Sequence, residues 1–264
     1  MLAVCTSCVQ KRFLHQAAPA INPVLKEKGD AFATGYYHTN GATRSDGNVD
    51  VSNSSSNGIH LQGGYAVSNH VAVLGSYNNI RQRNQYNDSY SDPFDSSNVL
   101  YKRNEFTVAG DYYLTADDQK SVFHVIGGFT FGKLSFTDNG KDAGSNYSRF
   151  FKSNSFMAFV QPTFTLYSFE HTGFTIYPKV SYVQYGSVNT NYTDQEKTRL
   201  RLIDAKGFYT SEIGGKVFFG LDEFPLLVDV QSNYIIMHSA RIHVRRFDFA
   251  VGLTYLFQKR KKAK

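Results

Sequence analysis

The sequence lacks tryptophan, has no cysteine after Cys8, and contains no long apolar run. A membrane-spanning helix needs roughly 18 consecutive apolar residues, and no stretch approaches that length. Any crossing of a membrane would therefore be made by strands, and only a closed barrel satisfies the backbone of strands in lipid. Because both cysteines lie in the first eight residues, disulfides do not form a framework for the rest of the chain.

The chain also lacks an excess of one charge sign outside its C-terminus. The formal net charge is +6, and the run over residues 259–264 supplies most of it. No motif for RNA or DNA accompanies this tail, so we expect a solvated terminus and no nucleic-acid partner. The double glycines at 127–128 and 214–215 lie inside predicted strands. They do not indicate phosphate-binding loops, and we expect no cofactor.

Aromatic residues are abundant, with 22 Phe and 18 Tyr, which favours pleated strands. From Asp30 onward, apolar residues alternate with polar ones at the period of a strand. In the last segment one face holds Phe247, Phe249, Val251, Leu253, Tyr255 and Phe257. The pattern recurs ten times, at about 31–39, 58–66, 71–80, 101–114, 121–136, 154–167, 174–182, 208–220, 226–235 and 246–257.

These segments have the length that crosses a bilayer at a tilt, and their connections alternate between short and long. The connections 67–70, 115–120, 168–173 and 221–225 are tight, whereas 40–57, 81–99, 138–149 and 186–204 are long and polar. The sequence therefore predicts an all-β domain over 30–257, a single antiparallel up-and-down transmembrane β-barrel of about ten strands. The expected barrel has short periplasmic turns, long external loops and both termini in the periplasm.

Alternation alone does not decide which face is enclosed, because a soluble ligand-binding barrel would turn its apolar face inward. Here the apolar face carries bulky aromatics, and the opposite face carries charges of both signs at mid-strand positions. We therefore expect lipid outside and a paired charge network in the lumen. Its predicted members are Arg103, Glu105, Asp111, Lys179, Glu212, Lys216, Asp229, Arg246 and Asp248. Pro162 and Pro178 lack a ladder donor, and bulges are expected there.

The first residues indicate processing. Residues 1–8 resemble the remnant of an export signal of a lipoprotein, with Cys8, or else Cys5, as the lipidation candidate. The two also form a CxxC pair, but the βαβ context of a redox motif is missing. Pro19, Pro23 and mixed charges predict a periplasmic linker over 9–29. Residues 258–264 are expected to form a basic periplasmic tail.

The closing segment FDFAVGLTYLF resembles the C-terminal strand of bacterial outer-membrane barrels. In that class the strand is thought to be recognised by the assembly machinery, which would make Phe247, Phe249, Tyr255 and Phe257 an assembly signal. The stretch NPVLKEKGD (22–30) and the hairpin GIHLQGGYAVSNHVAVLGSY (58–77) resemble uncharacterised lipoprotein-like barrels of the Bacteroidota. The resemblance implies an integral outer-membrane location, contact with outer-membrane lipid, and assembly by that machinery.

No catalytic or metal site is recognisable in the sequence. Omptin-type proteases share the strand number, but Asp88, Asp92 and Asp95 have no Asp-x-His arrangement facing them. His38, His60, His238 and His243 approach the external strand ends, yet side-chain parity separates His60 from His243. We therefore expect a non-catalytic envelope protein that is structural or binds a partner or ligand. The alternatives are a narrow channel for ions or small solutes and, third, a surface hydrolase acting through Asp88 or Asp92.

Overall fold

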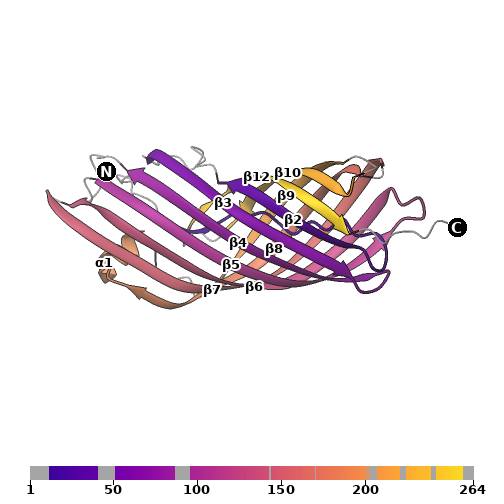
Figure 1. Ribbon diagram of the computed structural model, residues 1–264. Coiled ribbons are helices and arrows are strands. Elements are labelled where there is room, and N and C mark those ends of the chain that lie inside the picture. Colours follow the sequence, from indigo (N-terminus) through magenta and orange to yellow (C-terminus); the bar gives the residue numbers. More distant parts are fainter. Residues whose placement is uncertain are drawn as a thin grey trace, which may run out of the picture.

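Ten long strands form one closed antiparallel barrel (Figure 1). This computed structural model describes residues 12–40, 51–86, 96–142, 144–169, 171–200, 202, 207–220, 224–238 and 242–257. The barrel strands are β2 (Ala31–Thr39), β3 (Val51–Ala66), β4 (Val71–Tyr86), β5 (Ser96–Thr115), β6 (Ser121–Asp142), β7 (Ser145–Phe169), β8 (Thr172–Thr190), β9 (Phe208–Gly220), β10 (Leu226–Met237) and β12 (Phe247–Phe257). Two short strands, β1 (Phe13–Gln16) and β11 (His243–Arg245), pair in parallel, and α1 (Asp194–Leu200) follows β8. No helix in the described ranges is long and apolar enough to span a membrane.

Consecutive strands are neighbours around the wall, and β12 closes the barrel by pairing with β2. The closing register places Phe257 opposite Ala31 and Phe249 opposite Thr39. The prediction of a single up-and-down barrel of ten strands is confirmed. The predicted segments 31–39 and 208–220 coincide with β2 and β9.

The two ends of the barrel differ in the length of strand that projects there. At one end, which we call the short-turn end, tight turns such as Val67–His70 join the strands. At the other, the long-strand end, β6 continues to Asp142 and β7 begins at Ser145. The expected long connection over 138–149 is therefore wrong, because its polar residues continue the antiparallel ladder. Parts of 40–57, 81–99 and 186–204 likewise belong to strands.

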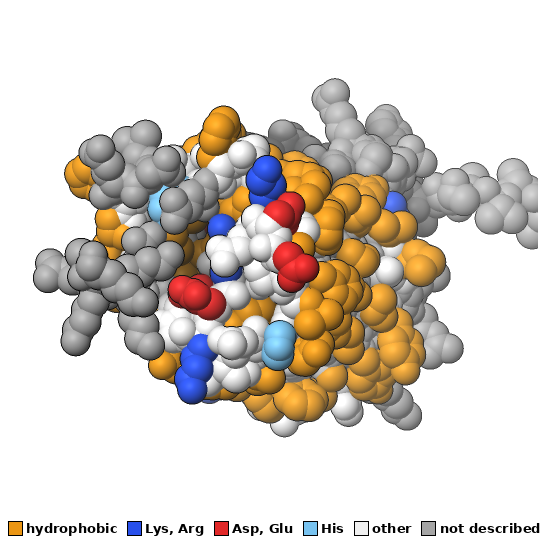
Figure 2. Space-filling view, turned by 90° about the vertical axis from the view of Figure 1, so that its right-hand side faces the viewer, with side chains coloured by type: hydrophobic (Ala, Val, Ile, Leu, Met, Phe, Trp, Pro, Cys, Tyr) orange, Lys and Arg blue, Asp and Glu red, His pale blue; other side chains and the backbone are white. Residues whose placement is uncertain are grey.

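The apolar face of each strand points outward and the ionic face is enclosed. Phe131 and Phe257 are 55% and 52% exposed, whereas Lys216 is 1% exposed. Figure 2 looks onto the short-turn end and shows hydrophobic side chains around the outside, with charged side chains of both signs toward the middle. The prediction that the aromatics lie outside and the charges inside is confirmed.

The exterior apolar band has the height expected for a bilayer-spanning barrel. On β5 it runs from Leu114 to Phe106, both of which are exposed. Eight residue steps cover about 27 Å along a strand, and a tilt of about 40° reduces this to roughly 20 Å of vertical height, close to the ~25 Å band of outer-membrane barrels.

Pro162 and Pro178 occupy the same step of the β7–β8 ladder rather than separate bulges. The paired residues stop at Val160 and Val180 and resume at Phe164 and Ile176 with an unchanged offset. The expected bulges at the prolines are therefore absent; the register shifts between these strands lie near Asn154 and Phe169 instead. Neither proline has an N–H to donate to the ladder. Because the two lie opposite each other, the missing hydrogen bonds are confined to one stretch of the β7–β8 pair.

The loss of stability caused by a charge on the exterior shows whether the apolar band contacts lipid or water. We expect Val160→Arg, at a position 52% exposed in mid-band, to lower the free energy of unfolding by about 2–4 kcal/mol in lipid vesicles. Asn154→Arg, on the same strand above the aromatic residues, serves as the control and should cost at most about 1 kcal/mol. Denaturant titration in vesicles measures both, and equal small costs would contradict a lipid-facing exterior.

Candidate functional site: the occupied lumen

Residues 12–26 lie inside the barrel, and we call them the lumen segment. Every residue from Arg12 to Leu25 is buried except the half-buried Ala18. The interpretation of 9–29 as a linker is therefore wrong for the part that is described, since a linker would be solvated. A ten-stranded barrel is wider than the eight-stranded kind that side chains alone can fill. The lumen segment occupies this extra room.

The segment passes from the long-strand end to the short-turn end. Arg12 contacts Asp138 and Ser97 at the long-strand end, while Lys28 donates to Asn69 in a tight turn at the other end. The last described residue, Phe257, also lies at the short-turn end, paired with Ala31. The first and last described residues thus lie at opposite ends of the barrel. Residues 1–11 and 258–264 lie outside the described part of the chain, and the placement of both termini on one side stays a prediction.

The wall holds the lumen segment mainly through its backbone carbonyls. Seven of these oxygens accept hydrogen bonds from wall side chains. The pairs are Leu14 with Arg103 and Tyr185, Ala17 with Asn40, Ala18 with Asn233, Ala20 with Gln231, Ile21 with Gln161, Asn22 with Lys216, and Lys26 with Thr115. A buried carbonyl without a hydrogen-bond partner is costly. Most of the segment has no backbone hydrogen bonds to the wall strands, so these side-chain donors allow an extended chain to lie inside the barrel.

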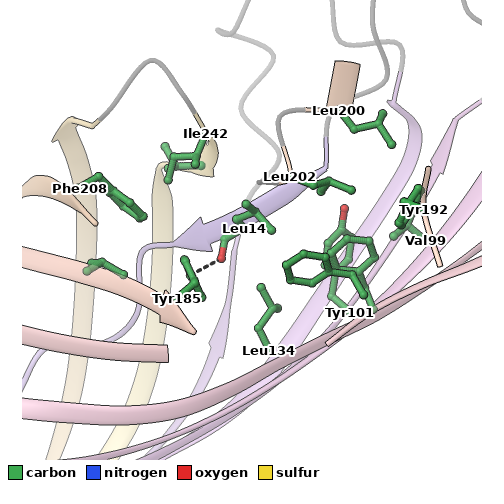
Figure 3. Close-up of a cluster of buried hydrophobic side chains, with 14 of the residues drawn as sticks. Leu14, Val99, Tyr101, Leu134, Tyr185, Tyr192, Leu200, Leu202, Phe208 and Ile242 are labelled. Carbon is green, nitrogen blue, oxygen red and sulfur yellow. Dashed lines mark hydrogen bonds between the residues drawn. The ribbon is translucent and has the colours of Figure 1, made fainter. Parts of the chain in front are cut away.

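Two apolar clusters flank this polar layer. Near the long-strand end, Leu14 packs among side chains that include Tyr101, Leu134 and Phe208. Figure 3 shows this cluster, with the Tyr185 hydroxyl donating to the Leu14 carbonyl. Toward the short-turn end, Ile21, Val24 and Leu25 pack in the second cluster, against residues that include Phe32, Tyr113 and Phe218. The lumen segment is therefore part of the hydrophobic core.

Several of the nine predicted lumen charges form local pairs. Arg103 contacts Glu105 at 3.4 Å and Lys179 contacts Glu212 at 3.5 Å. The second bond of Arg103, at 2.5 Å, goes to the Leu14 carbonyl, and Lys216 Nζ donates to the Asn22 carbonyl at 2.9 Å. Part of the positive charge is thus directed at the lumen segment rather than at carboxylates.

The remaining predicted carboxylates contact groups outside the predicted set. Asp111 accepts from His124 at 2.8 Å and Asp248 from His38 at 2.9 Å. Asp229 accepts from the hydroxyl of Thr254. Arg246 is half-buried and contacts His238 just before β12 begins. Side-chain parity identifies lumen-facing carboxylates, but it does not identify their partners on other strands.

Asp138 is a buried charged group that sequence reasoning missed, as are Arg12 and Arg245. It accepts hydrogen bonds from Arg12, Ser97, Tyr147 and Tyr192, and its ion pair with Arg12 is fully buried, with N–O contact at 2.6 Å. Asp138 falls in a stretch that the sequence predicts as a loop, so side-chain parity did not show that it points inward. The sequence did contain one signal for its partner segment: residues 13–25 are more apolar than a solvated linker would be.

The segment after β8 closes over Asp138. Glu196 and Thr193 form a reciprocal cap at the start of α1, as in a capping box. Glu196 also accepts hydrogen bonds from two guanidinium nitrogens of Arg149 of β7, Nε and Nη2. Burial acts to raise the pKa of Glu196, but the bonds from Arg149 and Thr193 outweigh it and hold that pKa below its ordinary value.

The other predicted site residues give a mixed outcome. Phe249, Tyr255 and Phe257 are exposed on the outer face and Phe247 is half-buried, and their role as an assembly signal stays a prediction. Cys5 and Cys8 lie outside the described residues, as do Asp88, Asp92 and Asp95 of the hydrolase alternative. Lipidation and the resemblance to barrels of the Bacteroidota stay predictions as well.

Comparison with known proteins places the chain only by its fold. No protein-family model matches the sequence, and no curated protein matches it significantly. Among solved structures, the translocator domain of the autotransporter NalP from Neisseria meningitidis is 9% identical, with a TM-score of 0.47 over 86% of this chain and 87% of that one. The outer-membrane protease OmpT from Escherichia coli is 12% identical, with a TM-score of 0.46 over 87% and 94%.

A third match is the COG4313 outer-membrane channel from Pseudomonas putida F1, 12% identical with a TM-score of 0.38 over 90% of this chain and all of that one. The three names describe a translocator, a protease and a channel. The likeness therefore assigns none of these activities to the present chain.

The ion pair at the long-strand end gives a first test. We expect Asp138→Leu to lower the free energy of unfolding by about 3–5 kcal/mol, because it leaves the buried Arg12 guanidinium without its carboxylate. Adding Arg12→Leu should then cost little or restore part of the stability. Lys197→Leu, which breaks the exposed pair with Asp194, is the control and should change stability by less than about 1 kcal/mol. Strictly additive losses in urea titrations would contradict the pairing.

The Arg149–Glu196 contact gives a second test. A carboxylate whose pKa is lowered by folding stabilises the structure above its ordinary pKa and loses that effect as pH falls through the lowered value. We expect hydrogen exchange of the α1 amides to rise as pH falls below about 4, after correction for intrinsic exchange. Glu196→Gln should produce the same local opening at neutral pH. Asp117→Asn, at an exposed turn, should leave α1 protected; equal effects of both variants would exclude the link.

Proposed function

We propose that this chain is an integral protein of the bacterial outer membrane that works without catalysis, as a structural or binding component of the envelope, with its lumen kept closed by its own N-terminal segment. One observation carries the proposal: the lumen segment runs the length of the barrel interior and the wall holds it at seven carbonyls. A permanent open pore would not need these donors.

The outer face supports the membrane location. Aromatic and aliphatic side chains, among them Phe106, Phe131 and Val160, are half exposed around the wall, and lipid solvates such a surface where water would not. Outer-membrane lipid is thus the first partner. The barrel assembly machinery is the second, through the outward aromatics of β12.

The long-strand end supports a binding role. Strands β5 to β8 run 19 to 25 residues, well beyond the 9–11 that a tilted strand needs to cross a bilayer. The surplus builds a rigid wall outside the apolar band, and α1 is fixed to it through Arg149. We place the contact with an envelope protein or ligand at this end.

A narrow channel is the second candidate, and unpaired lumen groups favour it. Asn78 Oδ1, Asp229 Oδ1 and Gln231 Oε1 are buried and have no protein hydrogen-bond partner. Buried polar atoms of this kind bind water where there is space for it, which would provide a hydrated path beside the lumen segment. In that case the segment would act as a gate.

Conductance in planar bilayers separates the two. We expect the full chain to give no steady conductance. Gln231→Leu with Asn233→Leu removes the donors to the Ala20 and Ala18 carbonyls, so this variant should show transient openings.

The control is Thr107→Val with Thr130→Val, a buried pair on β5 and β6 whose hydroxyls hydrogen-bond to each other. It should stay closed. Steady conductance of the unaltered chain would favour the channel and contradict a closed lumen. Equal openings in both variants would show that the carbonyl contacts do not hold the segment.

A further inference from the structure

A row of cations crosses the outer face of four strands near the long-strand end. Arg81 on β4 lies opposite Lys102 on β5, Lys102 opposite Ser135 on β6, and Ser135 opposite Lys152 on β7. Arg81, Lys102 and Lys152 are all exposed. We call these three residues the basic row. Arg83 and Lys133, also exposed, extend the positive surface one step above and one step below it.

The positive charges of the row are not balanced by neighbours on the same face. The other outward positions next to them are Asn79, Leu100, Asn104, Thr137, Phe150 and Asn154, none of which carries charge; the Phe150 ring lies 5.7 Å from Lys152 Nζ. None of the ion pairs among the described residues includes a member of the row. Like charges directly opposite on adjacent strands, such as Arg81 and Lys102, destabilise a sheet. An anion bound between them would reduce this repulsion.

The row lies at a defined height above the apolar band. The highest level at which all four strands carry an aromatic residue contains Tyr77, Phe106, Phe131 and Phe156, which oppose one another. Arg81 follows Tyr77 by four residues, about 13 Å along the strand and roughly 10 Å in height at a tilt of about 40°. That height corresponds to the headgroup region directly above the hydrocarbon.

We propose that the basic row binds the phosphate groups of anionic lipids in the leaflet at the long-strand end, with the acyl chains lying on the aromatic row below. This inference rests on the proposed membrane location. Arginine offers a planar fork to phosphate oxygens and lysine a mobile point charge. The side-chain amides of Asn79 and Asn154, one step nearer the band, provide neutral donors for polar groups of the same lipid.

Among the described residues, the short-turn end has no comparable surface. Its exposed charges include Glu27, Asp117 and Asp118 together with Lys28 and Lys120. Mixed signs give little net attraction for an anionic headgroup. Within the described wall, the two ends therefore differ in charge, and we place the bound phosphate at the end from which the long strands project.

Native mass spectrometry of the full chain tests this directly. Phosphatidylglycerol and phosphatidylcholine with identical acyl chains serve as the anionic and zwitterionic probes. Each cation near a headgroup contributes about 1 kcal/mol, so Lys102→Gln with Lys152→Gln should weaken phosphatidylglycerol binding about 30-fold. Binding of phosphatidylcholine should not change. Inorganic phosphate at the same concentration should not displace the lipid, because it lacks the acyl chains.

The matched control is Lys28→Gln with Lys120→Gln, which removes the same charge at the other end and should leave lipid binding within about twofold. Heat-dependent gel mobility confirms that each variant is folded, and Lys102→Gln alone provides a milder variant. Equal losses in the two double variants, or no preference for the anionic probe, would overturn the basic row as a lipid site. Release of the unaltered protein from membranes by carbonate would instead refute the proposed location.

Discussion

An enclosed lumen has to be filled, and each polar group in it needs a partner. This constraint shapes the molecule. Ten strands make a cylinder wider than side chains alone fill, and the alternation that gives lipid an aromatic exterior sends every second, polar side chain inward. An extended segment of the chain answers much of both demands, because it brings apolar side chains to the two ends and backbone carbonyls to the donors between them.

The same constraint explains which features were predictable. Alternation within one strand is local, so neighbours such as Asp248 and Phe249 identify the two faces of β12, and ten such patterns predict the barrel. The lumen segment shows no alternation of apolar and polar residues, because it is held through its backbone. Its carbonyls accept hydrogen bonds from residues of many strands, including Gln161 and Lys216. Every residue offers a carbonyl, so this recognition requires no particular side chains in residues 12–26, and only their high apolar content indicates that they are buried.

The charged residues show a similar division between local and distant information. Side-chain parity identified Arg103 and Asp111 as inward-facing, and both are buried. Their partners, the Leu14 carbonyl and His124, depend on register between strands and on a segment absent from the predicted barrel. Asp138 was missed because polar composition resembles a loop when strands extend beyond the membrane into water, where an apolar alternation is no longer required.

The distance in sequence between the lumen segment and its donors also concerns how the protein folds. Ala18 and Asn233 are 215 residues apart, and Leu14 and Tyr185 are 171 apart. Contacts between residues so distant in the chain form slowly, because a large loop must close before they can contribute. The lumen segment thus obtains part of its hydrogen bonding only once β8 and β10 are in place around it. Pairing of β12 with β2 closes the wall, so the seam of the barrel and the enclosure of the segment depend on each other.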